Sequence, residues 1–244
     1  MTYVETRDGT KLFVKDWGQG LPVILLHGWP LSADMWDAQA MGLAESGYRA
    51  IAYDRRGFGR SSQPWAGYNY DALADDLADV ISATGAEDAT LVGFSMGGGE
   101  VARYMSRHGG AGVRSAVLVS SVVPYMLQTS DNPNGVPQSM FDDIGEGIEA
   151  DRTMTAMMAG LHPTLACADA FAHTDFRPDM ASFRVPTLII HGTADKTAPI
   201  DASGRAAAKG ISGSRLIEYE GAPHGLNVTH RERLTRDLVE FVAR

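Results

Sequence analysis

Three side chains of this sequence are of the types that together perform nucleophilic catalysis: Ser95, Asp195 and His224. A serine hydroxyl attacks a carbonyl carbon efficiently only when a base removes its proton, and histidine suits that task because it changes protonation near neutral pH. An acidic side chain can then hold the histidine in the required tautomer and orientation. The sequence around each of the three residues indicates why these particular ones are the candidates.

Ser95 lies in the segment 93–97, Gly-Phe-Ser-Met-Gly, between a run that predicts a strand and a spacing that predicts a helix. This is the setting of a nucleophile elbow, a tight turn that lifts a serine hydroxyl clear of a sheet. Such a turn is strained and leaves no room for a β-carbon two residues away on either side, which explains Gly93 and Gly97. We therefore predict Ser95 as the nucleophile; an ordinary strand-to-helix turn is the alternative.

The base and the acid are predicted to lie at the same edge of the sheet. His224 is the best placed of the seven histidines, because Gly-Ala-Pro-His-Gly forms a predicted loop between a strand and the last helix. Asp195 follows the carboxyl end of the predicted strand 187–191. A role in forming the turn is the alternative for Asp195, and the other candidate acids are Asp175 and Asp201.

Two backbone N–H groups are predicted to stabilise the negative charge that develops on the attacked oxygen. One is that of Met96, at the start of the helix after the serine. The other is that of Trp29 in the loop His-Gly-Trp-Pro, where Gly28 lets the backbone turn and Pro30 has no N–H to donate. We expect His27 to brace this loop rather than to react.

The elements that position these residues follow from apolar periodicity. Seven short apolar or β-rich runs predict strands at 11–17, 23–27, 48–53, 89–94, 115–120, 187–191 and 215–219. Five longer segments with apolar residues three and four apart predict helices at 33–46, 71–84, 98–108, 200–209 and 229–242. This alternation predicts an α/β fold: a mostly parallel, doubly wound sheet with a short antiparallel start and helices on both faces. We expect a single domain over residues 1–244.

A segment of about 126–185 interrupts the alternation. It begins with a turn-rich loop at 131–137 and continues into a predicted helix at 140–150 and a methionine-rich run. Ligands bind at the carboxyl ends of strands in such sheets, so a helical insert here would cover Ser95 as a lid. The alternative is that the methionines pack a helix against the core.

Composition limits the classes of partner. The chain is 44% hydrophobic and 21% charged, and its net charge of −9 argues against nucleic acid or an anionic membrane as a partner. No apolar stretch approaches the ~18 residues of a membrane span, and the first nine residues are polar. We therefore expect a soluble, cytoplasmic protein that acts on a small molecule. The sequence leaves its oligomeric state open, a homo-oligomer included.

Other candidate sites are weaker. The segment 54–61, Asp-Arg-Arg-Gly-Phe-Gly-Arg-Ser, lacks the Gly-Lys-Ser/Thr of a phosphate-binding loop, and we interpret it as a turn supported by arginine pairing. Cys167 is the single cysteine and lies among alanine and leucine, so we expect a small buried apolar residue rather than a reactive thiol. No cluster of cysteine and histidine suggests a zinc site.

Four segments resemble the cofactor-free haloperoxidase and arylesterase branch of the α/β-hydrolases: 27–32, 53–62, 93–100 and 219–226. The resemblance covers residues 3–128 and 171–242, and the chain order of serine, acid and histidine is the one that these hydrolases use. It implies the α/β-hydrolase fold and hydrolysis of small carboxylic esters through an acyl-serine. It also implies a side activity in which hydrogen peroxide replaces water and yields a peracid that oxidises halides. No haem, vanadium or other cofactor is implied.

Two features depart from that family. The lid is expected to be shorter, with the compression between residues 151–152 and 157–158. After the acid, the sequence reads Lys-Thr-Ala-Pro, with smaller and more polar residues at Thr197 and Ala198 than the β-branched apolar pair typical there. Both changes would open the pockets for the acyl and leaving groups, so the substrate preference is expected to differ.

Six residues are predicted by position to line the substrate pocket: Pro30, Phe94, Val122, Phe141, Met158 and Leu226. Two other functions fit the same residues. One is hydrolysis of a small amide or γ-lactam by the same machinery, and the other is a ligand receptor with negligible turnover. Dehalogenases and epoxide hydrolases are disfavoured, because those relatives carry aspartate where this chain has Ser95.

Overall fold

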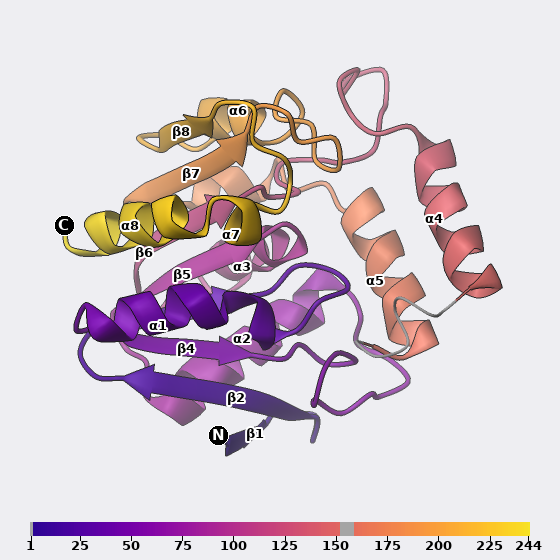
Figure 1. Cartoon of the computed structure of the whole chain (residues 1–244). Coiled ribbons are helices and arrows are strands. Elements are labelled where there is room, and N and C mark those ends of the chain that lie inside the picture. Colours follow the sequence, from indigo (N-terminus) through magenta and orange to yellow (C-terminus); the bar gives the residue numbers. More distant parts are fainter. Residues whose placement is uncertain (1, 152–158) are drawn as a thin grey trace.

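The computed structural model describes residues 2–151 and 159–244 of the chain. Eight strands form one sheet in the order β1-β2-β4-β3-β5-β6-β7-β8 (Figure 1). Their bounds are β1 (Thr2–Glu5), β2 (Lys11–Gly18), β3 (Pro22–Leu26), β4 (Arg49–Tyr53), β5 (Ala89–Phe94), β6 (Val113–Val119), β7 (Thr187–Gly192) and β8 (Arg215–Tyr219). β2 pairs antiparallel with both β1 and β4, and every other neighbouring pair is parallel. The predicted mostly parallel sheet with an antiparallel start is confirmed.

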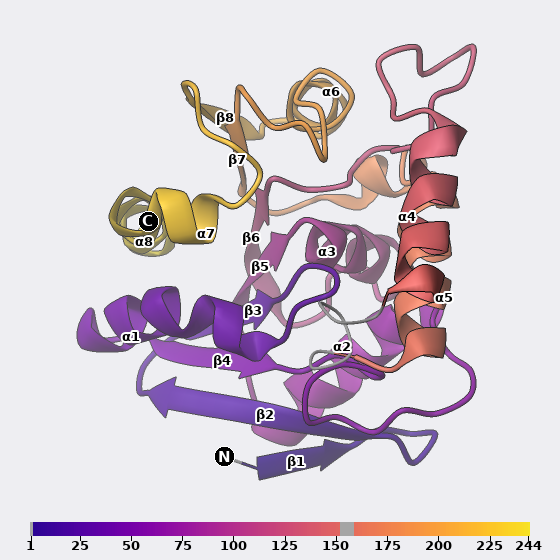
Figure 2. The ribbon, with the colours of Figure 1, turned by 45° about the vertical axis from the view of Figure 1, so that its right-hand side comes forward.

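Helices cover both faces of this sheet (Figure 2). On one face lie α1 (Asp37–Glu45), α7 (Leu226–Thr229) and α8 (Arg231–Val242); on the other lie α2 (Tyr70–Thr84), α3 (Met96–Arg107) and α6 (Gly204–Gly210). Two short 3-10 helices, η1 (Ala33–Trp36) and η2 (Asp179–Ser182), precede α1 and β7. Among the described residues, no helix is both long and apolar enough to cross a membrane.

The core consists of two apolar layers, one on each side of the sheet. In β3, Ile24 and Leu26 pack toward α2 and α3, whereas Val23 and Leu25 pack toward α1 and α8. Successive side chains of a strand point to opposite faces, so a strand covered on both sides must be apolar at every position. This explains why the central strands are continuous apolar runs rather than alternating ones.

Between β6 and β7 the chain forms a helical insert. It contains α4 (Gln138–Ala150) and α5 (Leu161–His173), which lie beyond the end of the sheet to which the arrows of β4 and β7 point (Figure 1). Only Ile148 of α4 is buried, whereas α5 buries Cys167 and Phe171 among its residues. The three methionines of the methionine-rich run, Met154, Met157 and Met158, lie outside the described residues.

Some elements differ from those that periodicity predicts. β1 is an additional strand, and the helix predicted at 33–46 divides into η1 and α1. The helix α5 has no counterpart among the predicted helices, and its sequence contains Pro163. Pro163 is the third residue of α5, where a proline is tolerated because its missing N–H would have had no partner within the helix.

A buried ion pair joins the elements that lead to the serine. The guanidinium of Arg55, just after β4, donates from Nε to Glu100 Oε2 at 2.9 Å, and both side chains are almost completely buried. Arg55 also donates to the backbone oxygen of His27 at 2.8 Å, and the Tyr53 hydroxyl donates to Glu100. Glu100 lies on α3, so one guanidinium connects the ends of β3 and β4 with this helix. The expectation that arginine pairing supports the segment 54–61 is confirmed.

We predict that Glu100→Gln will lower the free energy of unfolding by about 3 to 5 kcal/mol, because it leaves the guanidinium of Arg55 buried without a counterion. Urea unfolding monitored by circular dichroism will measure the change. Glu240→Gln is the matched control: Glu240 pairs with Arg244 on the exposed surface, so its loss should have little effect. An equal, small effect of both substitutions would show that the buried pair does not hold the fold.

Candidate active site

Ser95 occupies a strained turn between β5 and α3. Its φ of 52° and ψ of −118° are rarely adopted by a residue with a side chain, and such a conformation costs on the order of 1–3 kcal/mol. A β-carbon on Gly93 would lie 2.4 Å from the carbonyl oxygen of Gly97, and one on Gly97 would lie 2.5 Å from that of Leu26. Only glycine fits at both positions, as the elbow motif predicts.

The structure brings the three predicted side chains together at the carboxyl ends of the strands. His224, on the loop after β8, has its Nε2 3.0 Å from Ser95 Oγ and its Nδ1 2.7 Å from Asp195 Oδ2. A carboxylate only accepts hydrogen bonds, so Nδ1 is the protonated nitrogen and Nε2 is free to accept from the serine hydroxyl. This arrangement can remove the serine proton and return it to a leaving group.

The carboxylate of Asp195 is held by donors on several sides. The N–H groups of Thr197 and Ala198 both donate to Oδ1 at 2.9 Å. Burial by itself raises the pKa of Asp195, but the hydrogen bonds from His191 and His224 outweigh it, and the pKa lies well below the usual range. Asp195 therefore stays ionised at any pH at which the protein would be assayed.

His191, which is not among the predicted site residues, supports Asp195. It is fully buried at the end of β7, and its Nε2 lies 3.2 Å from Asp195 Oδ2 and 2.8 Å from the Ala198 oxygen. Both of these are acceptors, so Nε2 carries the proton and donates. The two other candidate acids, Asp175 and Asp201, pair with arginines instead.

The two predicted oxyanion donors flank the serine. Among the residues that the structure describes, the backbone N–H groups of Trp29 and Met96 donate to no other group. The loop passes close to the nucleophile, since a β-carbon on Gly28 would lie 3.2 Å from Ser95 Cβ. Two unpaired N–H groups, one of them at the N-terminus of α3, can bind a developing oxyanion.

His27 and Trp29 fix this loop from both sides. His27 is buried, its Nε2 accepts from the Arg55 N–H at 3.0 Å, and its Nδ1 lies 2.8 Å from the Gly28 oxygen. Burial and the charge of Arg55 lower the pKa of His27 well below its usual value, so the ring is neutral. On the other side, the indole N–H of Trp29 donates to the Thr164 oxygen of α5 at 2.9 Å. His27 thus braces the loop, as expected.

A cavity of about 340 Å³ opens onto the serine. Its lining residues are Trp29, Ser95, Val122, Met126, Val136, Met140, Phe141, Ile144, Phe171, Lys196, Thr197, Ala198 and His224. Most of them are apolar, which suits a small ligand with one reactive polar group. Val122 and Phe141, two of the predicted pocket residues, are among them.

Three predicted pocket residues do not line the cavity. Phe94 and Leu226 belong to the apolar layer toward α1 and α8. The centroid of the Phe94 ring lies 5.0 Å from that of the His224 ring, so the two rings pack against each other. Pro30 lies in a turn that the Leu31 N–H closes onto the Gly28 oxygen, and the peptide bond before it is cis. The remaining prediction, Met158, falls outside the described residues.

Several cavity residues were missed in the sequence. Met140 and Ile144 lie on the same face of α4 as the predicted Phe141, a helical spacing that could have been recognised in the sequence. Phe171 was not predicted because it lies on α5, which has no counterpart among the predicted helices.

Cys167, as expected, is buried, and burial raises the pKa of its thiol to about 12. Among the described residues, no group of three His, Cys, Asp or Glu side chains is arranged to hold a metal ion.

The fold and this site are those of an α/β-hydrolase, and known proteins of that class match the chain. A family described as the alpha/beta hydrolase fold matches residues 22–151. A non-haem chloroperoxidase from Kitasatospora aureofaciens is 41% identical, and a bifunctional esterase/perhydrolase from Acinetobacter calcoaceticus is 38% identical, each over 99% of both chains. The structure of an esterase from Exiguobacterium antarcticum has a TM-score of 0.96 and 33% identity, covering 100% of this chain and 99% of that one.

The chain therefore belongs to the α/β-hydrolase family and is an enzyme of that class. Within the family it belongs to the haloperoxidase and esterase branch that its motifs resemble. The alignment with the chloroperoxidase runs over 273 positions, more than the 244 residues of this chain, so that relative has segments without a counterpart here. The expected place of the shortening, between residues 151–152 and 157–158, reaches outside the described residues and stays a prediction.

We predict that Asp195→Asn will lower kcat for a 4-nitrophenyl ester by roughly 10³ to 10⁴, because an amide can neither fix the tautomer of His224 nor stabilise its protonated form. The amide oxygen can still accept from Thr197 and Ala198, so the melting temperature should change little. Asp201→Asn is the control, since Asp201 is exposed and pairs with Arg205. Retention of more than a tenth of the wild-type rate by the Asp195 variant would rule out Asp195 as the orienting acid.

Proposed function

We propose that the protein is a serine carboxylesterase that hydrolyses small esters, with Ser95 as nucleophile, His224 as general base and Asp195 as the acid that orients it. The observation that carries the proposal is the continuous hydrogen-bonded chain from Asp195 through His224 to Ser95, which ends in an apolar cavity. An apolar cavity favours the acyl or aryl group of an ester. The hydroxyl of Ser95 is the polar group that reacts with the ester carbonyl.

The reaction begins when Ser95 Oγ attacks the ester carbonyl and His224 Nε2 accepts the hydroxyl proton. The carbonyl oxygen becomes an oxyanion that receives hydrogen bonds from the N–H groups of Trp29 and Met96. His224 then donates the proton to the departing alcohol, leaving the acyl group on Ser95. A water molecule, deprotonated by His224, attacks the acyl-serine, and the carboxylic acid leaves as Ser95 regains its proton.

Preorganisation of charge supplies much of the rate. The anionic Asp195 stabilises the imidazolium that forms in each step, and it is already in place before the substrate binds. The loop that holds the Trp29 N–H is braced by His27 and by Thr164, so the donor needs no reorganisation during the reaction. Each oxyanion donor of this type is worth about 2.7–4 kcal/mol in other serine hydrolases.

We predict that Ser95→Ala will lower kcat by on the order of 10⁴ to 10⁶, since members of a catalytic unit fail together. Steady-state turnover of 4-nitrophenyl acetate will measure it, and a serine-directed fluorophosphonate should label the wild type but not the variant. The wild type should complete many rapid turnovers, whereas a receptor would stall after one. A variant that keeps more than a few per cent of the activity would show that Ser95 is not the nucleophile.

Perhydrolysis, in which hydrogen peroxide replaces water as the acyl acceptor, is a second activity that we propose for the same site. The esterase/perhydrolase similarity favours it, and the oxyanion loop offers a physical route. Pro30 restricts the backbone at its own position and at Trp29. A Trp29 carbonyl oxygen turned toward the acyl-serine would accept a hydrogen bond from the distal hydroxyl of peroxide, which water lacks.

We predict that Pro30→Leu will lower perhydrolysis relative to hydrolysis of the same acyl group by several-fold, the factor that one net hydrogen bond of about 0.5 to 1.5 kcal/mol provides. Peracetic acid formed from acetate and peroxide will be compared with the hydrolysis of an acetate ester. Because Pro30 does not line the cavity, kcat/KM for the ester should change less. Equal losses in both reactions, or no peracid from the wild type, would remove the role of this loop in perhydrolysis.

A further inference from the structure

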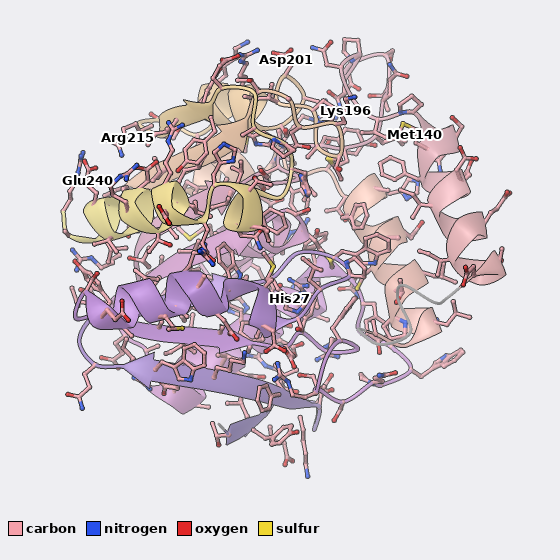
Figure 3. The ribbon with its side chains drawn as sticks, in the orientation of Figure 1. His27, Met140, Lys196, Asp201, Arg215 and Glu240 are labelled. Carbon is pink, nitrogen blue, oxygen red and sulfur yellow. The ribbon has the colours of Figure 1, made fainter. Side chains whose placement is uncertain are left out.

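Of the described residues that line the cavity, Lys196 is the one that carries a formal charge. Around it the wall is formed mainly by apolar side chains from the insert and from the loop after β6. In Figure 3, Lys196 lies on the loop that follows β7, and Met140 lies across from it at the beginning of α4. A single cation at the edge of an apolar cavity is a specificity device when a substrate carries the opposite charge.

The position of Lys196 is fixed by the catalytic acid. It stands between Asp195 and Thr197, in the turn that closes when the N–H groups of Thr197 and Ala198 donate to the Asp195 carboxylate. The backbone of Lys196 is therefore held beside the pair of Asp195 and His224. Its side chain is exposed, so the ammonium is hydrated and can reach a ligand at low cost.

No acidic side chain among the described residues pairs with Lys196. The adjacent carboxylate, that of Asp195, is already occupied by its four donors. The acidic residues of α4 are exposed and do not line the cavity; they are Asp142, Asp143, Glu146 and Glu149. By contrast, Lys15 is enclosed by Asp34 and Asp37. The ammonium of Lys196 is thus available to an anionic ligand.

We propose, on the basis of the esterase function above, that the site prefers ester substrates carrying a second, free carboxylate, which Lys196 binds at the mouth of the cavity. A carboxylate inside the apolar wall would lose its hydration without compensation. At the mouth it keeps part of its hydration and pairs with the ammonium, while the apolar part of the substrate fills the cavity and its ester carbonyl meets Ser95. The net charge of −9 disfavours anionic ligands over most of the protein surface. The ammonium of Lys196 provides a local positive charge at which an anionic substrate can bind.

The test uses two pairs of esters that differ only in charge. For the acyl side, the 4-nitrophenyl monoester of glutaric acid is compared with that of its monoamide. For the alcohol side, the acetate ester of 4-hydroxybenzoate is compared with that of 4-hydroxybenzamide. We expect KM of the wild type to be about 3- to 10-fold lower for the anionic member of one pair, with the advantage reduced in 0.5 M salt, as for an exposed ion pair.

Lys196→Met should abolish this difference, and Lys196→Arg should largely retain it. Lys209→Met is the matched control, because Lys209 is an exposed lysine on α6 away from the cavity. A difference in KM within the glutarate pair places the bound carboxylate on the acyl side, and a difference within the 4-hydroxybenzoate pair places it on the alcohol side. If the wild type hydrolyses the neutral esters but Lys196→Met leaves the ratio of anionic to neutral KM unchanged in both pairs, the proposal is wrong. Failure to hydrolyse any of the esters would instead overturn the esterase function itself.

Discussion

The ion pair between Arg55 and Glu100 is the constraint on which the catalytic geometry depends. Removing both charges from water is costly, and the cost is offset only where the geometry is good and further hydrogen bonds satisfy the remaining donors and acceptors. Here Arg55 donates to Glu100 and to the His27 oxygen, and Tyr53 donates to Glu100. Glu100 is one helical turn after Met96, so this pair holds the start of α3 and the loop of Trp29 in a fixed relation. The Trp29 and Met96 N–H groups, which we propose as the oxyanion donors, come from separate segments, and the ion pair ties these two segments together.

The strain at Ser95 is a second consequence of the architecture. β5 lies between β3 and β6 in the middle of the sheet, and its neighbours hold it along its whole length. The Ser95 N–H donates to the Val119 oxygen at the end of β6, so the strained turn is also tied to the adjacent strand. The packed core around these strands supplies far more stabilisation than the unfavourable backbone conformation removes. The sheet can therefore hold a reactive hydroxyl in a position that an isolated turn would not adopt.

The proposed catalytic groups and most of the cavity wall come from different parts of the chain. The serine, the histidine, the acid and the oxyanion loop all belong to the ends of sheet strands, whereas most of the apolar cavity wall belongs to the insert between β6 and β7. The two parts meet at Trp29, which lines the cavity while its indole donates to Thr164 and packs edge-on against Phe171. A change in the insert can thus alter which substrates enter without displacing the catalytic groups, as long as the contact between Trp29 and α5 is kept.

The α/β class, the parallel sheet and the three residues that meet at its edge could all be predicted from the sequence. These follow from local rules: a strand covered on both faces must be apolar throughout, and the elbow around Ser95 admits only glycine at 93 and 97. Which side chains reach the cavity, by contrast, depends on how the elements pack. Phe94 and Leu226 are close to Ser95 and His224 in sequence, yet they pack into the apolar layer between the sheet and the helices α1 and α8. The helix α5, the support of Asp195 by His191 and the place of Lys196 at the cavity mouth also required the structure. Each depends on segments distant in the chain that come together only when the whole sheet is packed, and no local spacing encodes that.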